Sequence, residues 1–133
     1  MIVFDTSAII DFLRGGRNTK RIVESVENAG ERVAMTTVSL FELLSPIEHR
    51  RLHREEAAVR AFAQQAIVLG LDSNAAAAAS KIMGGLLRLG TPPNPLDVLI
   101  AGIAVANGSE KIVTSDKDFD QIPKIEDVKI EFF

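Results

Sequence analysis

The sequence predicts an α/β fold in which a central, mainly parallel β-sheet lies between two layers of α-helices. Short apolar segments of strand type alternate along the chain with longer segments of helical periodicity. Strands separated by helices favour parallel pairing, because a parallel connection must cross the sheet. The 133 residues, 47% of them hydrophobic, suffice for one buried core. No repeat or long linker divides the chain, so residues 1–133 are expected to form a single domain.

The first half of the chain is predicted to hold two strands and four helices. In order they are the strand Ile2–Phe4, the helices Thr6–Arg14 and Arg17–Ala29, the strand Val33–Thr36, and the helices Val38–Ser45 and His53–Gln65. The strands are apolar runs, and the first two helices are closed by glycines. Pro46 is expected to kink or end the third helix, because proline lacks an amide hydrogen.

The second half is predicted to hold three strands and two helices. In order they are the strand Ala66–Leu69, the Ala-rich helix Ser73–Leu89, the helix Leu96–Asn107, and the strands Lys111–Thr114 and Val128–Phe132. The proline-rich segment at 92–95 is expected to be a rigid loop. Gly84 and Gly85 each weaken the Ala-rich helix by about 1 kcal/mol relative to alanine. Their presence suggests a close approach of another segment, within the chain or across a dimer.

Composition excludes several classes of protein. There is no cysteine, which rules out a disulfide scaffold, a thiolate zinc site and a cysteine nucleophile, and fits a reducing cytoplasm. Fifteen Lys and Arg against 18 Asp and Glu give a net charge of −3, which does not suggest a strongly basic nucleic-acid binder. The longest apolar run is too short for a membrane helix, and the first residues lack the basic start of a secretion signal.

Four acidic residues occupy positions where a carboxylate needs an explanation. Asp5 follows the first predicted strand, and Asp116 follows the fourth after one serine. Glu42 is the only charged residue between positions 33 and 47, and Asp97 is the only one between positions 95 and 109. A carboxylate facing an apolar layer is costly unless it is paired, hydrogen-bonded or bound to a cation.

Three of these acids also have a purely structural explanation. Asp5 is suited to cap the following helix, Asp97 to favour the dipole of its own helix, and Asp116 to cap a short turn. Glu42, in the middle of a helix, has no such role. Taken together, the four acids predict a cation site, and oxygen ligands without cysteine or a histidine cluster favour Mg²⁺ or Mn²⁺. Such ions support phosphodiester hydrolysis.

The same residues lie in motifs that resemble the PIN-domain family, and most closely the VapC toxins of VapBC toxin–antitoxin pairs. The motifs are DTS at the N-terminus, TTVSLFELL, PLDVLIAGIA and TSDKDF, in the order of the family. The resemblance implies a PIN-like fold, Mg²⁺- or Mn²⁺-dependent cleavage of RNA, a VapB-like antitoxin partner and a homodimer. It assigns catalysis to Asp5, Glu42, Asp97 and Asp116, metal binding to these four and to Asp118, and pocket hydroxyls to Thr6 and Thr114. Gly102 stands where many relatives have alanine, a difference expected to matter little.

Rival interpretations remain open at this point. A phosphatase with an aspartate nucleophile would also begin with a strand and an aspartate, but it needs a second aspartate where Ser7 stands. A catalytically inactive PIN-like binding module would keep the acids only for a structural ion. His49 and His53 have the spacing of a zinc pair, although no third ligand is evident. With Arg50, Arg51 and Arg54 they form a basic run that is either a solvated face or an RNA contact.

Overall fold

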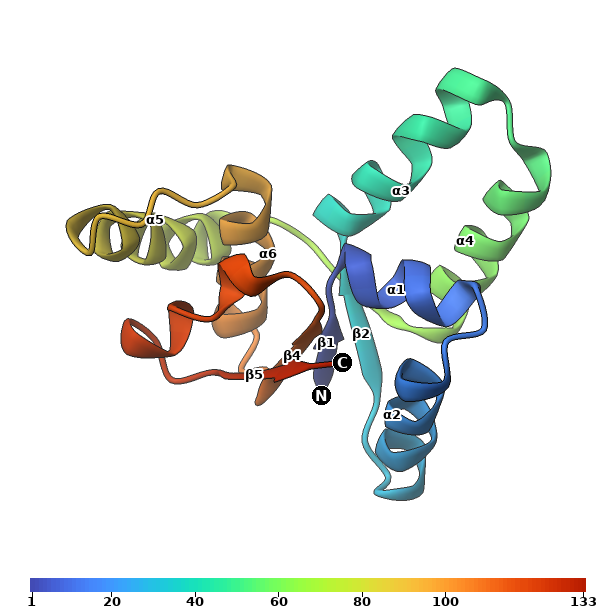
Figure 1. Ribbon diagram of the computed structural model, residues 1–133, viewed down its shortest axis with the longest axis horizontal. Coiled ribbons are helices and arrows are strands. Elements are labelled where there is room, and N and C mark those ends of the chain that lie inside the picture. The colour runs from blue at the N-terminus through green and yellow to red at the C-terminus, as the bar shows by residue number, and fades with distance from the viewer.

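Five strands form one parallel sheet in a computed structural model that describes residues 1–133 (Figure 1). The strands are β1 (Ile2–Phe4), β2 (Val33–Thr36), β3 (Ile67–Leu69), β4 (Lys111–Thr114) and β5 (Lys129–Phe132). Their order across the sheet is β3-β2-β1-β4-β5, and all four neighbouring pairs are parallel. The predicted three-layer α/β/α architecture is confirmed.

Six α-helices and two short 3₁₀ helices connect the strands. They are α1 (Thr6–Leu13), α2 (Arg17–Asn28), α3 (Thr37–Arg50), α4 (His53–Gln65), α5 (Ser73–Arg88), α6 (Pro95–Ala106), η1 (Lys117–Phe119) and η2 (Ile122–Lys124). Apart from α3, each predicted helix ends within one residue of the observed bounds. The two 3₁₀ helices lie in a segment for which the sequence predicted no element.

The predicted end of the third helix at Ser45, just before Pro46, is wrong. Helix α3 continues through Pro46 for another turn, to Arg50. Proline removes one backbone hydrogen bond, to the carbonyl of Glu42, but Pro46 itself is exposed to solvent. Leu43 and Ile47, on either side of it, are buried in the core. Their packing outweighs the single lost bond.

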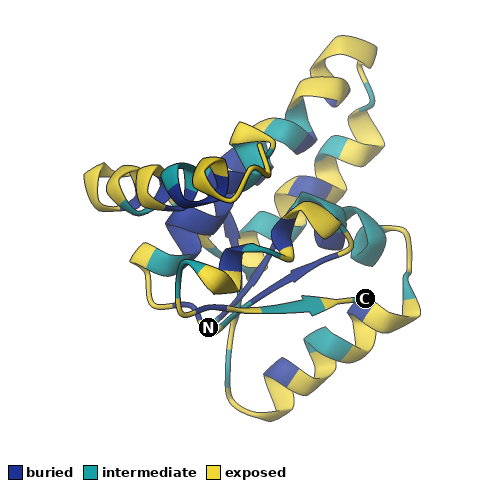
Figure 2. Cartoon of the chain, turned by 60° about the vertical axis from the view of Figure 1, so that its left-hand side comes forward, coloured by how far each residue is buried: buried dark blue, intermediate teal, exposed yellow.

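The core is divided into two parts by the sheet. Val3 and Ile112 pack on one face against α5 and α6, whereas Phe4 and Met35 pack on the other against α1, α2 and the α3–α4 pair. Successive residues of a strand point to opposite faces, and a strand covered on both faces is therefore apolar throughout. Figure 2 shows the central strands buried and the outer helix surfaces exposed.

Helices α5 and α6 approach each other closely at Gly102. A Cβ atom on Gly102 would lie 2.5 Å from the Cβ of Ala79 and 2.7 Å from its backbone. The expectation that alanine and glycine are equivalent at this position is therefore wrong. In the glycine pair of α5, a close approach within the chain explains only Gly85, because a Cβ atom there would meet Ile125 at 2.6 Å. Gly84 faces open space apart from the side chain of Arg88.

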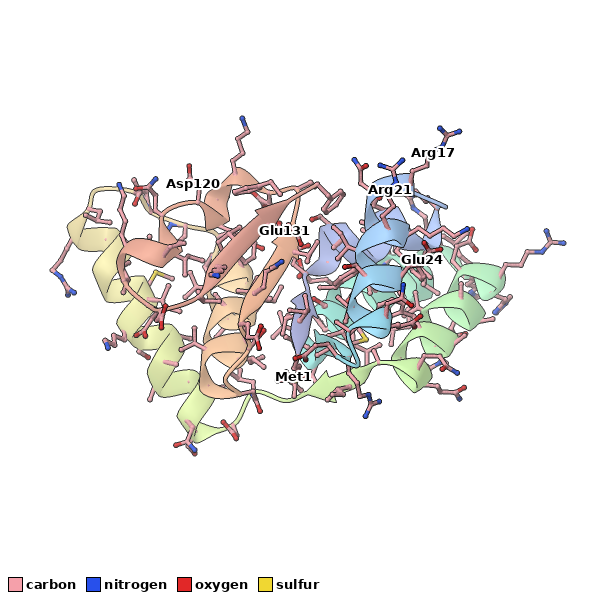
Figure 3. All side chains as sticks on the ribbon, turned by 90° about the horizontal axis from the view of Figure 1, so that it is seen from below. Met1, Arg17, Arg21, Glu24, Asp120 and Glu131 are labelled. Carbon is pink, nitrogen blue, oxygen red and sulfur yellow. The ribbon has the colours of Figure 1, made fainter.

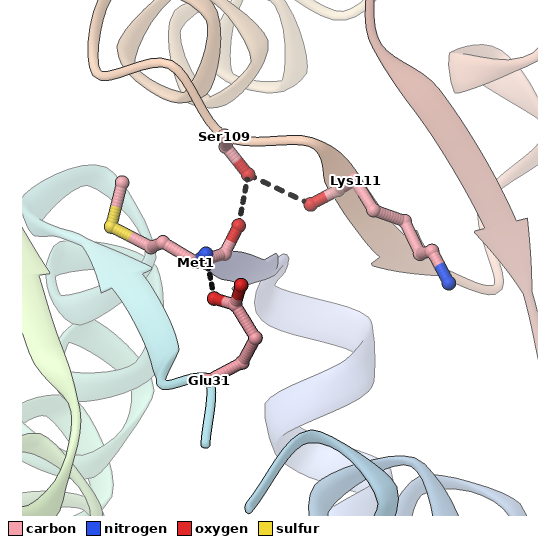
Figure 4. A network of polar contacts seen from close by, with 4 residues as sticks. All are labelled: Met1, Glu31, Ser109 and Lys111. Atoms are coloured by element: carbon pink, nitrogen blue, oxygen red, sulfur yellow. Dashed lines mark hydrogen bonds and ion pairs between the residues drawn. The ribbon is translucent and has the colours of Figure 1, made fainter. Parts of the chain in front are cut away.

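A small polar network fixes the start of β1 at the amino end of the sheet (Figure 4). The amino group of Met1 pairs with Glu31, just before β2. The hydroxyl of Ser109 donates to the carbonyls of Met1 and Lys111, at 3.2 and 2.9 Å. These contacts hold β1 between its two neighbours in register. None of the helices is both long enough and apolar enough to cross a membrane.

Candidate active site

The acidic residues meet at the carboxyl ends of two neighbouring strands, β1 and β4. β1 and β4 are neighbours, with Phe4 opposite Val113, and the amide of Asp5 continues the pairing by donating to Val113. From β1 the chain moves to β2, whereas from β4 it moves the other way, to β5. Open parallel sheets bind ligands outside the carboxyl ends of the strands at such a switch point. Asp5 and Asp116 follow β1 and β4 there.

Asp5 is buried and held by three hydrogen bonds. Its Oδ1 accepts from the hydroxyl of Ser7 at 2.7 Å and from the amide of Ala8 at 2.9 Å, and its Oδ2 accepts from the hydroxyl of Thr114 at 2.5 Å. The Ala8 contact makes Asp5 the N-cap of α1, as the structural explanation expected. Burial nevertheless raises the pKa of Asp5, although these hydrogen bonds act in the opposite direction. Its orientation is fixed before any ligand arrives.

Glu42 enters the same pocket from α3. Its Oε1 accepts from the hydroxyl of Thr6 at 2.7 Å, and the same hydroxyl lies 3.0 Å from that of Ser39. Ser39 is fully buried, and its amide donates to the side chain of Thr36, the N-cap of α3. The start of α3 is thereby tied to the start of α1, which sets where Glu42 points.

Asp97 contributes the one buried side-chain oxygen that lacks a hydrogen-bond partner. It is the third residue of α6, which Asn94 caps, as expected. Its Oδ2 is buried and has no hydrogen-bond partner. Burial raises the pKa of Asp97 to about 7, and the negative charges of Asp116, Glu42 and Asp5 contribute to the increase. A favourable helix position therefore does not account for this side chain.

Asp116 and Asp118 complete the acidic group beside β4. Asp116 caps η1, because its Oδ1 accepts from the amide of Asp118 at 2.9 Å, and its own amide donates to Thr114. One carboxylate oxygen from each of Asp97, Asp116 and Asp118 lies within 4.8 Å of the other two. Asp118, which the sequence alone left as the least certain ligand, thus lies in the tightest group. Asp5 and Glu42 stand beside this trio.

The donor set fits a hard divalent cation. Every candidate ligand is a carboxylate oxygen, which is the ligand type that Mg²⁺ and Mn²⁺ prefer. A buried oxygen with no partner and three converging carboxylates are costly without a positive charge. His49 and His53 are not part of the group, because both are exposed where α3 and α4 meet, and a zinc pair gains no support.

Two hydroxyl groups of the site went unrecognised in the sequence. Ser39 lies beside the Thr6 hydroxyl, and the hydroxyl of Ser7 joins the carboxylate of Asp5 to the amide of Ser115 at 3.0 Å. Ser39 stands one helical turn before Glu42, a spacing that could have indicated it. Ser7 could be recognised only as a further capping residue.

A large cavity lies elsewhere in the molecule. It has a volume of about 500 Å³ and is lined mainly by apolar side chains of α1, α2 and α4, among them Phe12, Val23 and Phe62. None of the five acids lines it. The chemistry that the carboxylates support is therefore separate from this apolar groove.

Comparisons with known proteins find similar sequences. The family model described as PIN domain matches residues 2–125. The tRNA(fMet)-specific endonuclease VapC of Salmonella typhimurium is 33% identical over 95 residues, which cover 71% of this chain and 72% of the relative.

Solved structures give the same result for the fold. VapBC2 from Rickettsia felis, bound to a promoter DNA fragment, gives a TM-score of 0.85 at 15% identity, over 100% of this chain and 99% of the other. DNA-bound VapBC from Salmonella typhimurium gives 0.82 at 28% identity, over 98% and 96%. VapBC-1 from nontypeable Haemophilus influenzae gives 0.81 at 22% identity, over 99% and 98%.

Proposed function

The chain belongs to the PIN-domain family, and from that premise we propose that it is a metal-dependent endoribonuclease, the toxin of a type II toxin–antitoxin pair. The relative named as a tRNA-specific endonuclease supports RNA as the substrate. The similar structures are toxin–antitoxin complexes, which supports a VapB-like antitoxin as the protein partner. A protein that cleaves RNA in this role acts in the cytoplasm.

The observation that carries the proposal is the oxygen of Asp97. It is buried, unpartnered and directed into a group of carboxylates that repel it. A structural helix cap would not need this arrangement, whereas a metal ligand does. The cation is Mg²⁺ or Mn²⁺, and Asp97, Asp116 and Asp118 would hold it.

The residues of the chain have distinct roles in the reaction. When bound, the cation supplies charge neutralisation at the phosphate and a more acidic water. Asp5, fixed by three hydrogen bonds, presents its carboxylate from the end of β1 toward the same centre. Glu42 accepts a hydrogen bond from Thr6 on one oxygen, which leaves the other to orient a water molecule and to take its proton. In the hydrolysis the water oxygen forms a new bond to phosphorus as one P–O bond of the RNA backbone breaks, and the leaving oxygen takes up a proton from solvent.

The test is cleavage of RNA by the purified protein. Wild type is compared with Asp97→Asn and Asp5→Asn, with Mg²⁺, with Mn²⁺ and with EDTA. Asp120→Asn is the matched control, because Asp120 is an exposed acid near η1 that lies outside the acidic group. We expect cleavage by wild type and the control with metal, a loss of at least 100-fold in both site variants, and none in EDTA.

Other outcomes would change the assignment. Cleavage that survives both site substitutions would show that the activity comes from a contaminant. A protein that binds metal but cuts no RNA would be a PIN-like binding module. A phosphatase gains no support, because Ser7 uses its hydroxyl on Asp5 and Ser115 and no second aspartate occupies its position.

A further inference from the structure

The far end of the α3–α4 hairpin carries three arginines and two histidines, with the exposed carboxylates of Glu48 and Glu55 on either side. Five of the six residues from 49 to 54 are basic, and the segment is called the hairpin tip below. The basic residues are His49, Arg50, Arg51, His53 and Arg54. All five are exposed, and none forms an ion pair, whereas Arg60 on the same helix pairs with Glu56. The tip extends away from the sheet (Figure 1), and its surface is exposed (Figure 2).

Arg51 occupies a backbone position that normally favours glycine. It closes α3 with φ 55° and ψ 50°, the left-handed conformation. It is the only residue other than glycine with a positive φ in the chain, and the other four such positions are glycines. Because a side chain is unfavourable there, a residue chosen for the turn alone would be glycine. An arginine stands at this position in spite of that preference, which points to a use for its side chain.

The tip is connected to the acidic pocket by one face of α3. Ser45, Pro46 and His49 follow Glu42 at helical spacing on that face, and all three are exposed. Glu48, the other carboxylate of α3, is exposed beside this face, three residues after Ser45. With a rise of 1.5 Å per residue, Arg50 lies roughly 12 Å along the helix from Glu42. At 3.4 Å or more per nucleotide, this separation corresponds to roughly two to four nucleotides of a strand.

The acidic pocket itself cannot attract a polyanion. It gathers five carboxylates, and the whole chain carries a net charge of −3. A cation in the pocket offsets only part of this charge, so additional positive groups must lie along the path of the RNA. Phosphate contacts by arginine are the usual source of that attraction.

We propose that the hairpin tip binds the RNA backbone, with Arg50, Arg51 and Arg54 contacting phosphates a few nucleotides from the cleavage site. The inference rests on the proposed function. It assigns a positioning role to residues that touch neither the metal ligands nor the bond that breaks. Their contribution is independent of base sequence, because phosphate contacts carry no sequence information.

The test measures RNA binding without cleavage. The probe is a fluorescently labelled, mixed-sequence single-stranded RNA of 20 nucleotides, in EDTA, and affinity is measured between 50 and 200 mM salt. The tip variant carries Arg50→Ala, Arg51→Ala and Arg54→Ala. The matched control carries Arg17→Ala, Lys20→Ala and Arg21→Ala, which removes three exposed and unpaired cations from α2. Figure 3 labels Arg17 and Arg21.

The expected result is a change in salt dependence. Each lost phosphate contact lowers the slope of log affinity against log salt by about 0.7, so the tip variant should lose about 2. The ratio of wild-type affinity to tip-variant affinity for the RNA should therefore fall by about 20-fold between 50 and 200 mM salt. The control should keep the wild-type slope. An unchanged slope in the tip variant, or an equal loss in both variants, would overturn the inference.

Arg51→Gly separates a contact from a structural role. Because glycine relieves the left-handed backbone, this variant should unfold at the wild-type temperature or above it, while its slope falls by about 0.7. Equal RNA affinity in Arg51→Gly and wild type would contradict the assignment of Arg51. Cleavage by wild type with Mn²⁺ is measured in parallel. If wild type cuts RNA but the tip variant binds RNA as wild type does, the inference fails and the proposed function stands. If wild type neither binds nor cuts RNA, both are overturned.

Discussion

At the scale of single residues, Asp97 makes the stability of the protein depend on pH. Its pKa is raised to about 7 in the folded chain without metal, from 3.8 in the unfolded chain. Between these values the folded state holds a proton that the unfolded state has lost. Stability is therefore expected to fall as pH rises from about 4 to 7 and then to level off. Asp5, whose pKa burial also raises, acts in the same direction.

Thermal unfolding in EDTA, recorded from pH 5 to pH 8, checks this dependence. Asp97→Asn should flatten the curve and unfold at a higher temperature than wild type at pH 8, because the repelled charge is gone. Adding Mg²⁺ or Mn²⁺ at pH 8 should raise the unfolding temperature of wild type and have less effect on the variant. A wild-type curve that rises from pH 5 to pH 8 would contradict the pKa of Asp97.

Thr114 offers a second prediction at this scale. Its hydroxyl donates to Asp5 and accepts from the amide of Asp116, and the residue is fully buried. Thr114→Val keeps the shape but leaves both partners unpaired, which should cost about 1–3 kcal/mol in the free energy of unfolding and reduce cleavage at least 10-fold. Thr114→Ser retains the hydroxyl and should recover most of the activity. Equal loss in both variants would show that packing, and not the hydrogen bonds, matters.

The residues of the site differ in how far the sequence could predict them. Asp97 and Glu42 stand out because each is the only charge in a long apolar stretch, and Asp5 because it follows a strand. The closeness of Asp118 to Asp97 was not predictable from spacing, because it depends on how the segment after β4 folds against the start of α6. The role of Ser39 depends likewise on the contact between α1 and α3.

At the scale of elements, the contact between α5 and α6 limits which residues fit at position 102. Gly102→Ala should lower the free energy of unfolding by about 1–3 kcal/mol, because the new methyl group would meet Ala79 at 2.5 Å. Gly84→Ala is the matched substitution in α5 itself, where space is open, and it should raise stability by about 0.5–1 kcal/mol. Urea unfolding measures both. If the two variants shift in the same direction, close packing does not explain Gly102.

The end of helix α3 is the kind of element boundary that could not be predicted from the sequence. Strands and most helices were predictable, because apolar runs, capping residues and glycines mark their ends locally. The continuation of α3 past Pro46 was not, because it depends on Leu43 and Ile47 packing against α1 and α4. Proline is a local signal, whereas burial of two large side chains is a tertiary one. The packing of these two side chains contributes more than the proline costs. The additional turn extends α3 to the hairpin tip.

At the scale of the whole molecule, the site depends on the complete fold. Its acids come from the start of α1, from α3, from α6 and from the segment after β4, and they reach one pocket only when β1 and β4 pair. The two layers of helices contribute on both sides of the sheet. No fragment of the chain retains the group, so the capacity to bind metal should disappear together with the cooperative unfolding of the domain.

The exposed apolar side chains bear on the predicted homodimer. Phe41, Leu87 and Leu89 are 63, 56 and 50% exposed, and a subunit interface would remove such apolar surface from water. Light scattering should therefore give about twice the chain mass of 14.4 kDa. Phe41→Arg should shift the protein toward the monomer if α3 forms the interface, whereas Leu71→Arg, at an exposed position after β3, should not. A wild-type mass of one chain at about 100 µM would contradict the dimer, and a dimeric Phe41→Arg would place the interface away from Phe41.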